Sequence, residues 1–421
     1  MDLDKESKQL AIEAKKLIED VCEVAWTRLP GSEGEKKAQE FLREKMKELG
    51  AEEVNVRNFK VYSRFFRWWP EISIYLFLIS LVAYLFIPLV ALALSALAVA
   101  NIFFKLFSYT FLDVLFKANP SSNVVGKLKV KDVPKRVLIL GGHTDSNYEY
   151  PLVGKYGSGF IKYLIPIFGL LVIWILTALL RFIDTVIAHG IIGDINVVAW
   201  GVFTNPAWYD WLYFAQFFGL PYVLYLGFNV VTSKPVCGAN DNLSGVSVTL
   251  QILNYFHKHP DERPNNVELW FTCFGSEEGG MMGSKAMAKD VRNALDDGTF
   301  PAKSVWVINF DSVAATGPLH IATSEPLYRC KYLPDVYTAL GKSAEKAGVE
   351  YFSKSLAAGT DSAPFGRLEI PGTGVLCFGE GPSPAHWHTL DDIPENLDIT
   401  GIINCIKLGI QFVKDVDESL K

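Results

Sequence analysis

The chain has 421 residues, enough for one large domain with insertions or for two domains. Its formal net charge is −6 and it has no basic tract, so nucleic acid is not an expected partner. Half of the residues are hydrophobic and the mean hydropathy is +0.19; this excess is concentrated between Trp68 and Thr232.

The first part of the chain has the pattern of a soluble protein. Residues 5–21 have the apolar spacing of an amphipathic helix, and a second helix is expected from a capping box of Ser32 and Glu35 to a stop at Gly50. Residues 52–63 then alternate as in a strand. The six cysteines are scattered without a CxxC pair and the first residues are charged, so we expect reduced thiols in the cytosol and no secretory signal.

Two apolar regions interrupt this pattern. Ile72 to Phe104 contains no charged residue, and this run exceeds the roughly 20 residues that span a bilayer. It fits either one tilted span or a hairpin with its hinge near Pro88. The second region holds uncharged runs at 163–180 and 211–232, with an interfacial or amphipathic stretch between them.

A hydrophobic cap or an oligomer interface on a soluble protein would also place apolar residues here. Long uncharged runs that are rich in Trp and Tyr and flanked by Lys or Arg favour a lipid bilayer as the partner. Each insertion must leave and rejoin the globular domain, so we expect two crossings in each. Cations flank the ends nearest the globular domain, which predicts an integral membrane protein whose globular domain is cytoplasmic.

The remainder has the pattern of an α/β domain. Strands are expected at 267–274, 304–310 and 374–378, with helices such as 244–257 and 334–347 between them. The expected fold class is α/β, a mixed and mostly parallel sheet flanked by helices, with inserted transmembrane helices. The predicted segments are 1–66, 119–156 and 234–421 for the globular domain, and 67–118 and 157–233 for the membrane insertions.

Five separate stretches carry the side chains of a metal site. They are GGHTDS with His143 and Asp145, GANDNLSG with Asp241, GSEEGG with Glu277 and Glu278, VINFDSV with Asp311, and HWHTLDDIPENLD with His386 and His388. Four of them follow strand-like runs or open helices, where ligands bind to open α/β sheets. Each stretch alone also fits a structural role, such as a core histidine or a capping aspartate. Together they predict a site for zinc, whose usual ligands include His and carboxylates.

In this order, the motifs His-x-Asp, Gly-Ala-Asn-Asp-Asn-x-Ser-Gly, Glu-Glu, Asn-x-Asp and His-Thr-x-x-Asp resemble those of a known family. These are the zinc exopeptidases related to aminopeptidase Y, bacterial leucyl aminopeptidase, glutamate carboxypeptidase and glutaminyl cyclase, which share a phosphorylase/hydrolase-like fold. RLPGSEGEKKAQEFLREKMKELG resembles their N-terminal helix. The resemblance covers about 1–62, 119–150 and 234–416, so both apolar insertions lie outside it.

The resemblance implies a centre with two zinc ions. His143 and Asp311 would hold one ion, Glu278 and His388 would hold the other, and Asp241 would bridge them. Glu277 would be the general base, and Asp145 would support His143 and fix its tautomer.

Two further positions have two interpretations each. His386 lies two residues before His388 and could be the ligand instead, although His-Thr-x-x-Asp matches from His388. Asp361 in AGTDSAPF matches a family position that lines the substrate pocket, or it is a loop aspartate that caps a turn.

The expected function is that of a membrane-anchored di-zinc exopeptidase acting on peptides, and an aminopeptidase is preferred. Carboxypeptidase activity, acyl transfer of the glutaminyl cyclase type and an inert binding domain are the alternatives. His143 and Asp311 argue against the cyclase, and the presence of every ligand argues against an inert domain. The second insertion separates Asp145 from Asp241, so we expect it to emerge beside the active site and to restrict or position the substrate. The sequence does not decide whether zinc, cobalt or manganese is the working metal, or whether the protein forms an oligomer.

Overall fold

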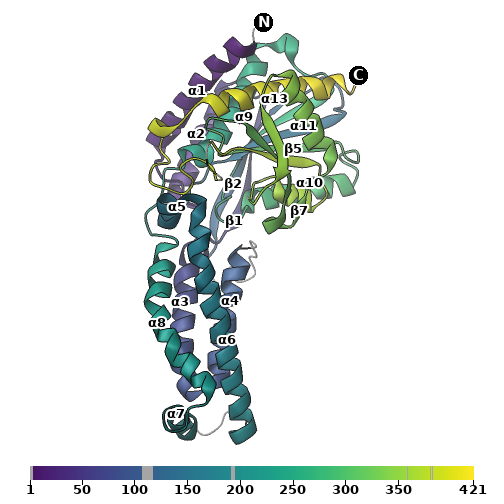
Figure 1. Ribbon diagram of the computed structural model, residues 1–421. Coiled ribbons are helices and arrows are strands. Elements are labelled where there is room, and N and C mark those ends of the chain that lie inside the picture. Colours follow the sequence, from purple (N-terminus) through teal and green to yellow (C-terminus); the bar gives the residue numbers. More distant parts are fainter. Residues whose placement is uncertain (1–2, 107–116, 191–194, 358, 380, 382) are drawn as a thin grey trace. The chain divides into compact units, whose positions relative to one another are not determined.

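The computed structural model describes residues 3–106, 117–190, 195–357, 359–379, 381 and 383–421 (Figure 1). The chain forms two compact units. Unit 1 comprises Met1–Ser63, Val114–Glu149 and Lys234–Lys421, and unit 2 comprises Arg64–Asp113 and Tyr150–Ser233.

Unit 1 is built on a nine-stranded sheet with the order β1-β2-β4-β3-β5-β9-β6-β7, in which β8 also pairs with β6. The strands are β1 Glu53–Val61, β2 Asn119–Leu128, β3 Arg136–His143, β4 Val267–Phe274, β5 Val305–Asp311, β6 Leu319–Glu325, β7 Cys330–Lys331, β8 Tyr351–Ser355 and β9 Gly372–Cys377. The neighbours β4, β3, β5 and β9 pair in parallel. The β1–β2, β2–β4, β6–β9 and β6–β7 pairs are antiparallel. The β6–β8 pair is also parallel. The expected mixed α/β fold is confirmed, with the four neighbouring parallel strands β4, β3, β5 and β9 in the centre of the sheet.

The alternation of side chains along the strands builds a core on each face of this sheet. In β3, Leu138 and Leu140 belong to one buried cluster, while Val137 and Ile139 belong to another. Helices α1, α2, α9, α11 and α13 contribute to the first cluster, and α10 and α12 to the second. The helices are α1 Leu3–Val24, α2 Glu33–Glu48, α9 Gly245–Lys258, α10 Met282–Asp296, α11 Pro334–Lys346, α12 Ala363–Arg367 and α13 Thr400–Glu418.

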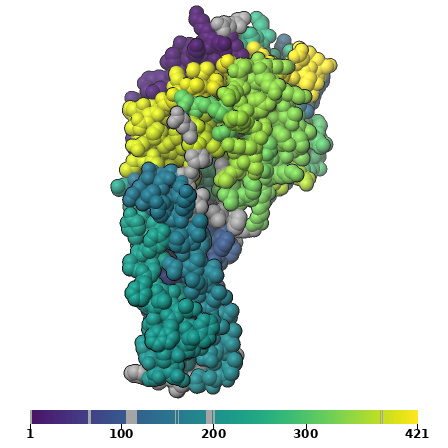
Figure 2. Space-filling view, in the orientation of Figure 1, coloured from purple at the N-terminus to yellow at the C-terminus, as the bar shows by residue number. Residues whose placement is uncertain are grey.

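Unit 2 is helical. Its helices are α3 Ser63–Phe86, α4 Pro88–Leu106, α5 Pro151–Tyr156, α6 Ile161–His189, α7 Ile195–Thr204 and α8 Trp208–Asn229. The first insertion is a hairpin hinged at Pro88, because Ser80 Oγ of α3 donates to the carbonyl oxygen of Ala91 in α4 at 2.8 Å. In Figure 2 the second insertion, coloured teal, forms most of the visible surface of unit 2.

Three helices of unit 2 are long and apolar enough to cross a membrane: Arg67–Phe86, Lys162–His189 and Trp208–Asn229. Many of their large apolar side chains are exposed, among them Phe218 at 92% and Ile187 at 79%. Apolar exposure on this scale marks a surface that meets another apolar medium. The described part of α4, Pro88–Phe104, is a shorter apolar helix.

A buried polar group lies inside unit 2. Asp210 is fully buried and accepts a hydrogen bond from the Tyr84 hydroxyl at 2.7 Å. The guanidinium of Arg181, also buried, lies 3.6 Å from the Asp210 carboxylate. A buried charge is costly unless it is paired, so these contacts hold α3, α6 and α8 in register.

Each insertion leaves unit 1 and rejoins it at neighbouring backbone positions. The last residue of β1, Val61, is the register partner of Asn119, the first residue of β2. Tyr148 forms an antiparallel bridge with Pro235, and the Glu149 N–H donates to the Lys234 carbonyl oxygen at 2.8 Å. Both insertions therefore replace the loop of an antiparallel pair.

Candidate active site

The predicted site residues come from the carboxyl ends of neighbouring strands and from two loops. His143 ends β3, Asp311 ends β5, and Glu277 and Glu278 follow β4 after two residues. Asp241 lies in the segment Ala239–Ser244 that leads into α9, and His388 lies in the loop after β9. Because β3, β4 and β5 are parallel neighbours, their carboxyl ends meet at one edge of the sheet.

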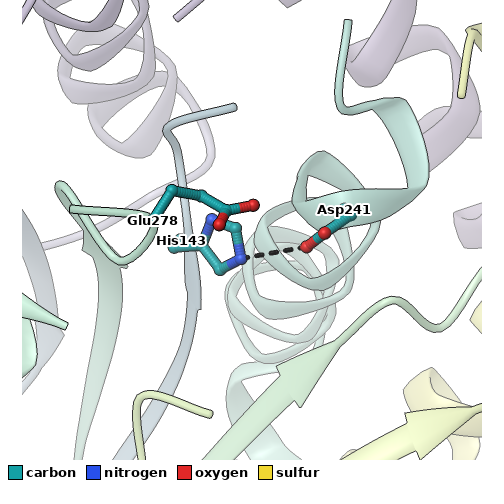
Figure 3. A group of neighbouring side chains, drawn as sticks. All are labelled: His143, Asp241 and Glu278. Carbon is teal, nitrogen blue, oxygen red and sulfur yellow. Dashed lines mark hydrogen bonds and ion pairs between the residues drawn. The ribbon is translucent and has the colours of Figure 1, made fainter. Parts of the chain in front are cut away.

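The carboxylate of Asp241 lies between two histidines. His143 Nε2 is 3.1 Å from Asp241 Oδ1, and His388 Nε2 is 3.1 Å from Asp241 Oδ2. His388 Nε2 is also 2.8 Å from Glu278 Oε1. Figure 3 shows Asp241 and Glu278 next to His143. Each carboxylate oxygen of Asp241 therefore points to a different histidine.

Asp311 and Glu277 lie near the His143 side of this cluster. Asp311 Oδ2 is 3.8 Å and Glu277 Oε2 is 4.0 Å from His143 Nε2. The Ser312 hydroxyl donates to Asp311 Oδ1 at 2.9 Å. His386, in contrast, is exposed, whereas His388 is buried and its Nε2 lies 3.1 Å from Asp241, so His388 is the histidine that joins the cluster.

The charges of the cluster fit a cation. Burial opposes charge on His388, but the carboxylates of Glu278 and Asp241 outweigh it and raise the pKa of His388 to about 10. Burial raises the pKa of Glu277 well above its ordinary value, and raises that of Asp311 to about 7. The pKa of Asp241 lies below its ordinary value because its hydrogen bonds with His143 and His388 outweigh burial. Without a metal, the raised pKa values favour protonated forms of His388, Glu277 and Asp311, which reduce the negative charge of the cluster. A bound metal ion would supply positive charge in place of these protons.

The donor set also fits zinc. Ligand atoms of His143, Asp241 and Glu278 all lie within 4.8 Å of one another. Nitrogen from histidine and oxygen from carboxylates are zinc ligands, and buried carboxylates of this density need a cation or protons to balance them.

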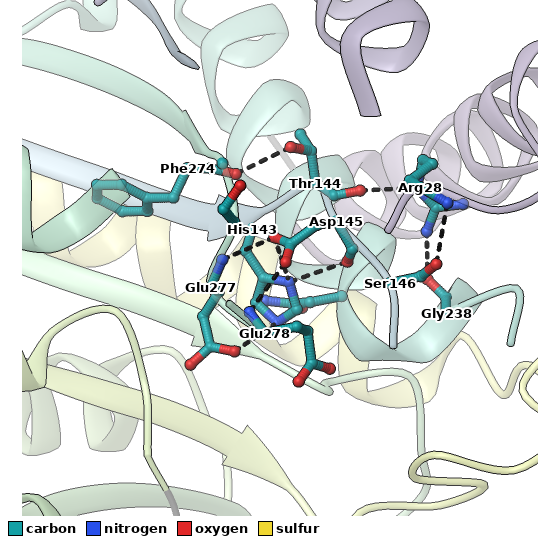
Figure 4. A network of polar contacts seen from close by, with 12 residues as sticks. Arg28, His143, Thr144, Asp145, Ser146, Gly238, Phe274, Glu277 and Glu278 are labelled. Carbon is teal, nitrogen blue, oxygen red and sulfur yellow. Dashed lines mark hydrogen bonds and ion pairs between the residues drawn. The ribbon is translucent and has the colours of Figure 1, made fainter. Parts of the chain in front are cut away.

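The turn that carries Glu277 and Glu278 is held by Asp145 (Figure 4). The N–H groups of Glu277 and Glu278 donate to Asp145 Oδ1 and Oδ2, each at 2.9 Å. His143 Nδ1 is 3.1 Å from the backbone carbonyl oxygen of Asp145 and 3.5 Å from its Oδ1. Donation from Nδ1 to that carbonyl leaves Nε2 free for a metal, so the peptide group of Asp145 contributes to the tautomer while its carboxylate fixes the turn.

The segment of Asp241 is held by Asp392. The Asn240 N–H donates to Asp392 Oδ1 at 2.6 Å, and the Asp241 N–H donates to Oδ2 at 3.1 Å. Asp392 is fully buried, and burial raises its pKa to about 7. It is the aspartate of the His-Thr-x-x-Asp motif, so the sequence contained the signal but gave it no role.

Two other contacts had no signal in the sequence. Asn147 Nδ2 donates to Glu278 Oε2 at 2.6 Å. The ring of Trp387 stacks on the ring of His388, with 4.2 Å between their centroids. Both contacts restrict the orientation of a predicted ligand.

Arg28 joins two of the ligand segments from the N-terminal region. Its buried guanidinium donates to the carbonyl oxygens of Thr144 at 2.7 Å and Gly238 at 2.9 Å (Figure 4). Thr144 follows His143, and Gly238 precedes Asp241 by three residues. Arg28 belongs to the RLPGSEGE stretch, whose sequence indicated only the start of a helix.

Asp361 lies in the same acidic surroundings. It is fully buried, burial raises its pKa to about 8, and the charge of Asp311 adds to that rise. Its own charge contributes to the raised pKa of Glu277. Asp361 is therefore close enough to the predicted base to affect it.

Comparison with known proteins agrees with these motifs. Residues 221–413 match Peptidase family M28. This part of the chain contains Asp241, Glu277, Glu278, Asp311 and His388. The resemblance to the zinc exopeptidases is therefore confirmed over this part of the chain. A search of curated proteins gave no match.

Solved structures with similar folds include peptidases and cyclases. A glutaminyl cyclase from Fimbriiglobus ruber has a TM-score of 0.54 at 15% identity, over 96% of this chain and 95% of the other. A leucine aminopeptidase precursor from Bacteroides thetaiotaomicron has a TM-score of 0.52 at 13% identity, over 96% of both chains. A Zn-dependent exopeptidase from Parabacteroides distasonis has a TM-score of 0.51 at 13% identity, over 97% of both chains. At these identities the likeness shows the fold.

Proposed function

We propose that this protein is a membrane-bound exopeptidase with two zinc ions, and that it removes residues from the free N-termini of peptides. The observation that carries the proposal is the position of Asp241, whose two carboxylate oxygens each lie 3.1 Å from a different histidine. A carboxylate placed in this way can bind one ion through each oxygen.

Each ion would have its own additional ligands. His143 and Asp311 would hold one ion, and Glu278 and His388 would hold the other, with Asp241 shared. The short contact between His388 Nε2 and Glu278 Oε1, at 2.8 Å, supports the second group. Bound zinc would supply a Lewis acid that polarises the scissile carbonyl and makes water a better nucleophile at neutral pH.

Glu277 is proposed as the general base. It lies 4.0 Å from His143 Nε2, beside the ligands. Burial raises its pKa well above the ordinary value, which suits a group that must take a proton from the attacking water and pass it to the leaving amine. Asp145 fixes the backbone of Glu277, so the carboxylate of Glu277 is aimed while its neighbour Glu278 binds metal.

The charges around the base favour a substrate with a free amino group. The ionised groups with the largest effects on the pKa of Glu277 are His143 and the carboxylates of Glu278, Asp361 and Asp311. Such an acidic site attracts the ammonium group of a peptide N-terminus and repels a C-terminal carboxylate. This argues for an aminopeptidase over a carboxypeptidase, with Asp361 as the proposed determinant of amine binding.

The membrane part of the proposal rests on unit 2. Its helices α3, α6 and α8 have the length and composition of membrane spans, and α4 completes the first hairpin. We propose two crossings per insertion, with unit 1 on the cytoplasmic side because Lys and Arg flank the ends that join it. The test is protease digestion of a C-terminal tag. Digestion in inverted membrane vesicles but not in intact cells would support a cytoplasmic position of unit 1.

The test uses detergent-purified full-length protein and a panel of peptides with free and acetylated N-termini. Cleavage of free N-termini alone, lost with a chelator and restored by zinc, is the expected result. The panel includes peptides with an N-terminal glutamine, for which release of ammonia without chain cleavage would identify cyclase chemistry instead.

Glu277→Gln separates the base from the metal ligands. It should keep its zinc and lose about 10²- to 10⁴-fold in kcat, the usual contribution of a general base. Zinc-loaded wild-type protein that is inactive on every peptide would contradict the proposed function.

A further inference from the structure

Glu35 is a buried acidic residue at the start of α2. Its exposed fraction is 1%, although it lies in the first turn of a helix whose other first-turn glutamate, Glu33, is exposed. Burial of a carboxylate is costly unless hydrogen bonds compensate it. The hydrogen-bond partners of the Glu35 carboxylate therefore indicate the role of this residue.

The capping box predicted from the sequence forms only in part. The Glu35 N–H donates to Ser32 Oγ at 3.2 Å, as expected. The carboxylate, however, accepts from the N–H of Gly31 at 2.6 Å, whereas the Ser32 N–H donates to the Leu29 carbonyl oxygen. The prediction was wrong in this half, because the carboxylate has further partners in other parts of the chain.

One of those partners, Ser276, belongs to the turn of the proposed base, and the other, Ser121, lies in β2. Glu35 Oε1 accepts from the Ser276 N–H at 2.6 Å and from the Ser276 hydroxyl at 2.9 Å. Glu35 Oε2 accepts from the Ser121 hydroxyl at 3.0 Å. Ser276 is fully buried and directly precedes Glu277. Glu35 therefore fixes the backbone immediately before the proposed base.

Ser276 has a backbone conformation that needs support. Its φ is 53°, in the left-handed region of the backbone that residues other than glycine adopt at a cost in free energy. The two hydrogen bonds to Glu35 hold this conformation. As a result, three consecutive N–H groups point to carboxylates: Ser276 to Glu35, and Glu277 and Glu278 to Asp145.

We propose that Glu35 is a positioning residue for Glu277, acting through Ser276. This inference rests on the proposed function. Glu35 touches neither a metal ligand nor the carboxylate of Glu277; it fixes the backbone from which that carboxylate extends. Asp145 holds the second half of the same turn, so the base and the ligand Glu278 depend on two acidic residues from separate segments.

The first experiment compares Glu35→Gln with Glu33→Gln, which removes the same charge from an exposed position of the same turn. Deuterium exchange of the peptide covering 275–282 is measured on zinc-loaded full-length protein. Glu35→Gln should speed exchange there at least about tenfold, since the Ser276 N–H loses its hydrogen bond to a charged acceptor. Glu33→Gln should leave it unchanged. Equal exchange in the two variants would overturn the proposal, whether or not the protein is a peptidase.

The second experiment measures turnover. Glu35→Gln should lower kcat by about 10- to 100-fold, the effect of a small misplacement of a catalytic group, while KM and bound zinc stay within about threefold. In a Glu277→Gln background the same change should have no further effect on kcat, because the group it positions is absent. An equal fall in both backgrounds would show that Glu35 supports the whole site, and would overturn the specific role.

A milder variant keeps the test available if Glu35→Gln does not fold. Ser276→Ala removes the hydroxyl contacts with Glu35 and Ser121 and keeps the N–H contact with Glu35. It should give a smaller change in the same direction in both exchange and kcat. Wild-type levels of both exchange and kcat in Ser276→Ala would contradict the inference. Inactive wild-type enzyme with the expected exchange pattern would contradict only the proposed function.

Discussion

Replacing Asp392 with asparagine is expected to weaken zinc binding although it changes no proposed ligand. Asp392 is fully buried, and its two oxygens accept the N–H groups of Asn240 and Asp241 at 2.6 and 3.1 Å. Asparagine has the same shape but only one oxygen, so its NH₂ group must face one of these N–H donors. The segment of Asn240 and Asp241 then loses one of the two contacts that orient Asp241 between His143 and His388.

The size of the effect follows from the lost contact. A hydrogen bond to a charged acceptor contributes about 1.5–3 kcal/mol, and each 1.4 kcal/mol is a factor of about ten in affinity. Changes to groups that orient metal ligands cost about 10- to 100-fold. The apparent zinc dissociation constant of Asp392→Asn should therefore rise by about 10- to 100-fold.

The assay is a titration of metal-free protein with zinc in competition with a chromophoric chelator. Asp391→Asn is the matched control, because Asp391 is the adjacent aspartate and is exposed. The control should bind zinc within about threefold of the wild type. If Asp392→Asn binds as tightly as the wild type, or Asp391→Asn loses as much, the reasoning from the two N–H contacts is refuted.

Three further predictions concern the ligand loop, pH and unit 2. His388→Asn should abolish bound zinc at one site and lower activity at least about 100-fold, while His386→Asn stays within about threefold, as checked by metal analysis and kcat/KM. Burial raises the pKa of Asp392 and Glu325 to about 7 in the folded state, so their stabilising effect is full below about 4 and is lost as pH rises through 7. The melting temperature of metal-free protein should accordingly rise from pH 8 to pH 5.5, and zinc should weaken or reverse this trend because it competes with protons; a flat profile without metal would contradict this. Asp210→Ala should destabilise unit 2 by about 3–5 kcal/mol in detergent, because Arg181 keeps a buried charge, whereas alanine at the exposed Asp184 should have little effect.

The sequence predicted the strands that have strong apolar runs. Strands β4, β5 and β9 are buried in the sheet, so their residues carry a clear signal. Strands β6 to β8 were not predicted. β7 has two residues, and most of β8 is exposed, so pairing with β6 defines these strands more than their own composition does.

The sequence predicted the side chains that are proposed to bind metal. It did not predict the side chains that accept hydrogen bonds from backbone N–H groups. His143, Asp241, Glu278, Asp311 and His388 lie in motifs with a fixed spacing, and the structure brings them together. Glu35 and Asp392 act by accepting hydrogen bonds from backbone N–H groups of distant segments. An acceptor for a backbone N–H leaves no pattern in the sequence, because the N–H is present in every residue except proline. Only the folded chain shows which carboxylate faces which peptide group.

Each insertion of unit 2 starts and ends at positions that are already paired in unit 1, so a short turn could replace it. Val61 and Asn119 are already partners across β1 and β2, and Glu149 and Lys234 are already joined by a hydrogen bond. An antiparallel pair needs as few as two residues to turn, and the entropic cost of a longer loop grows only slowly with its length. The sheet of unit 1 thus keeps its register whether a short turn or a helical hairpin fills each position. A water-soluble form of unit 1 should therefore be obtainable by replacing residues 62–118 and 150–233 with short turns.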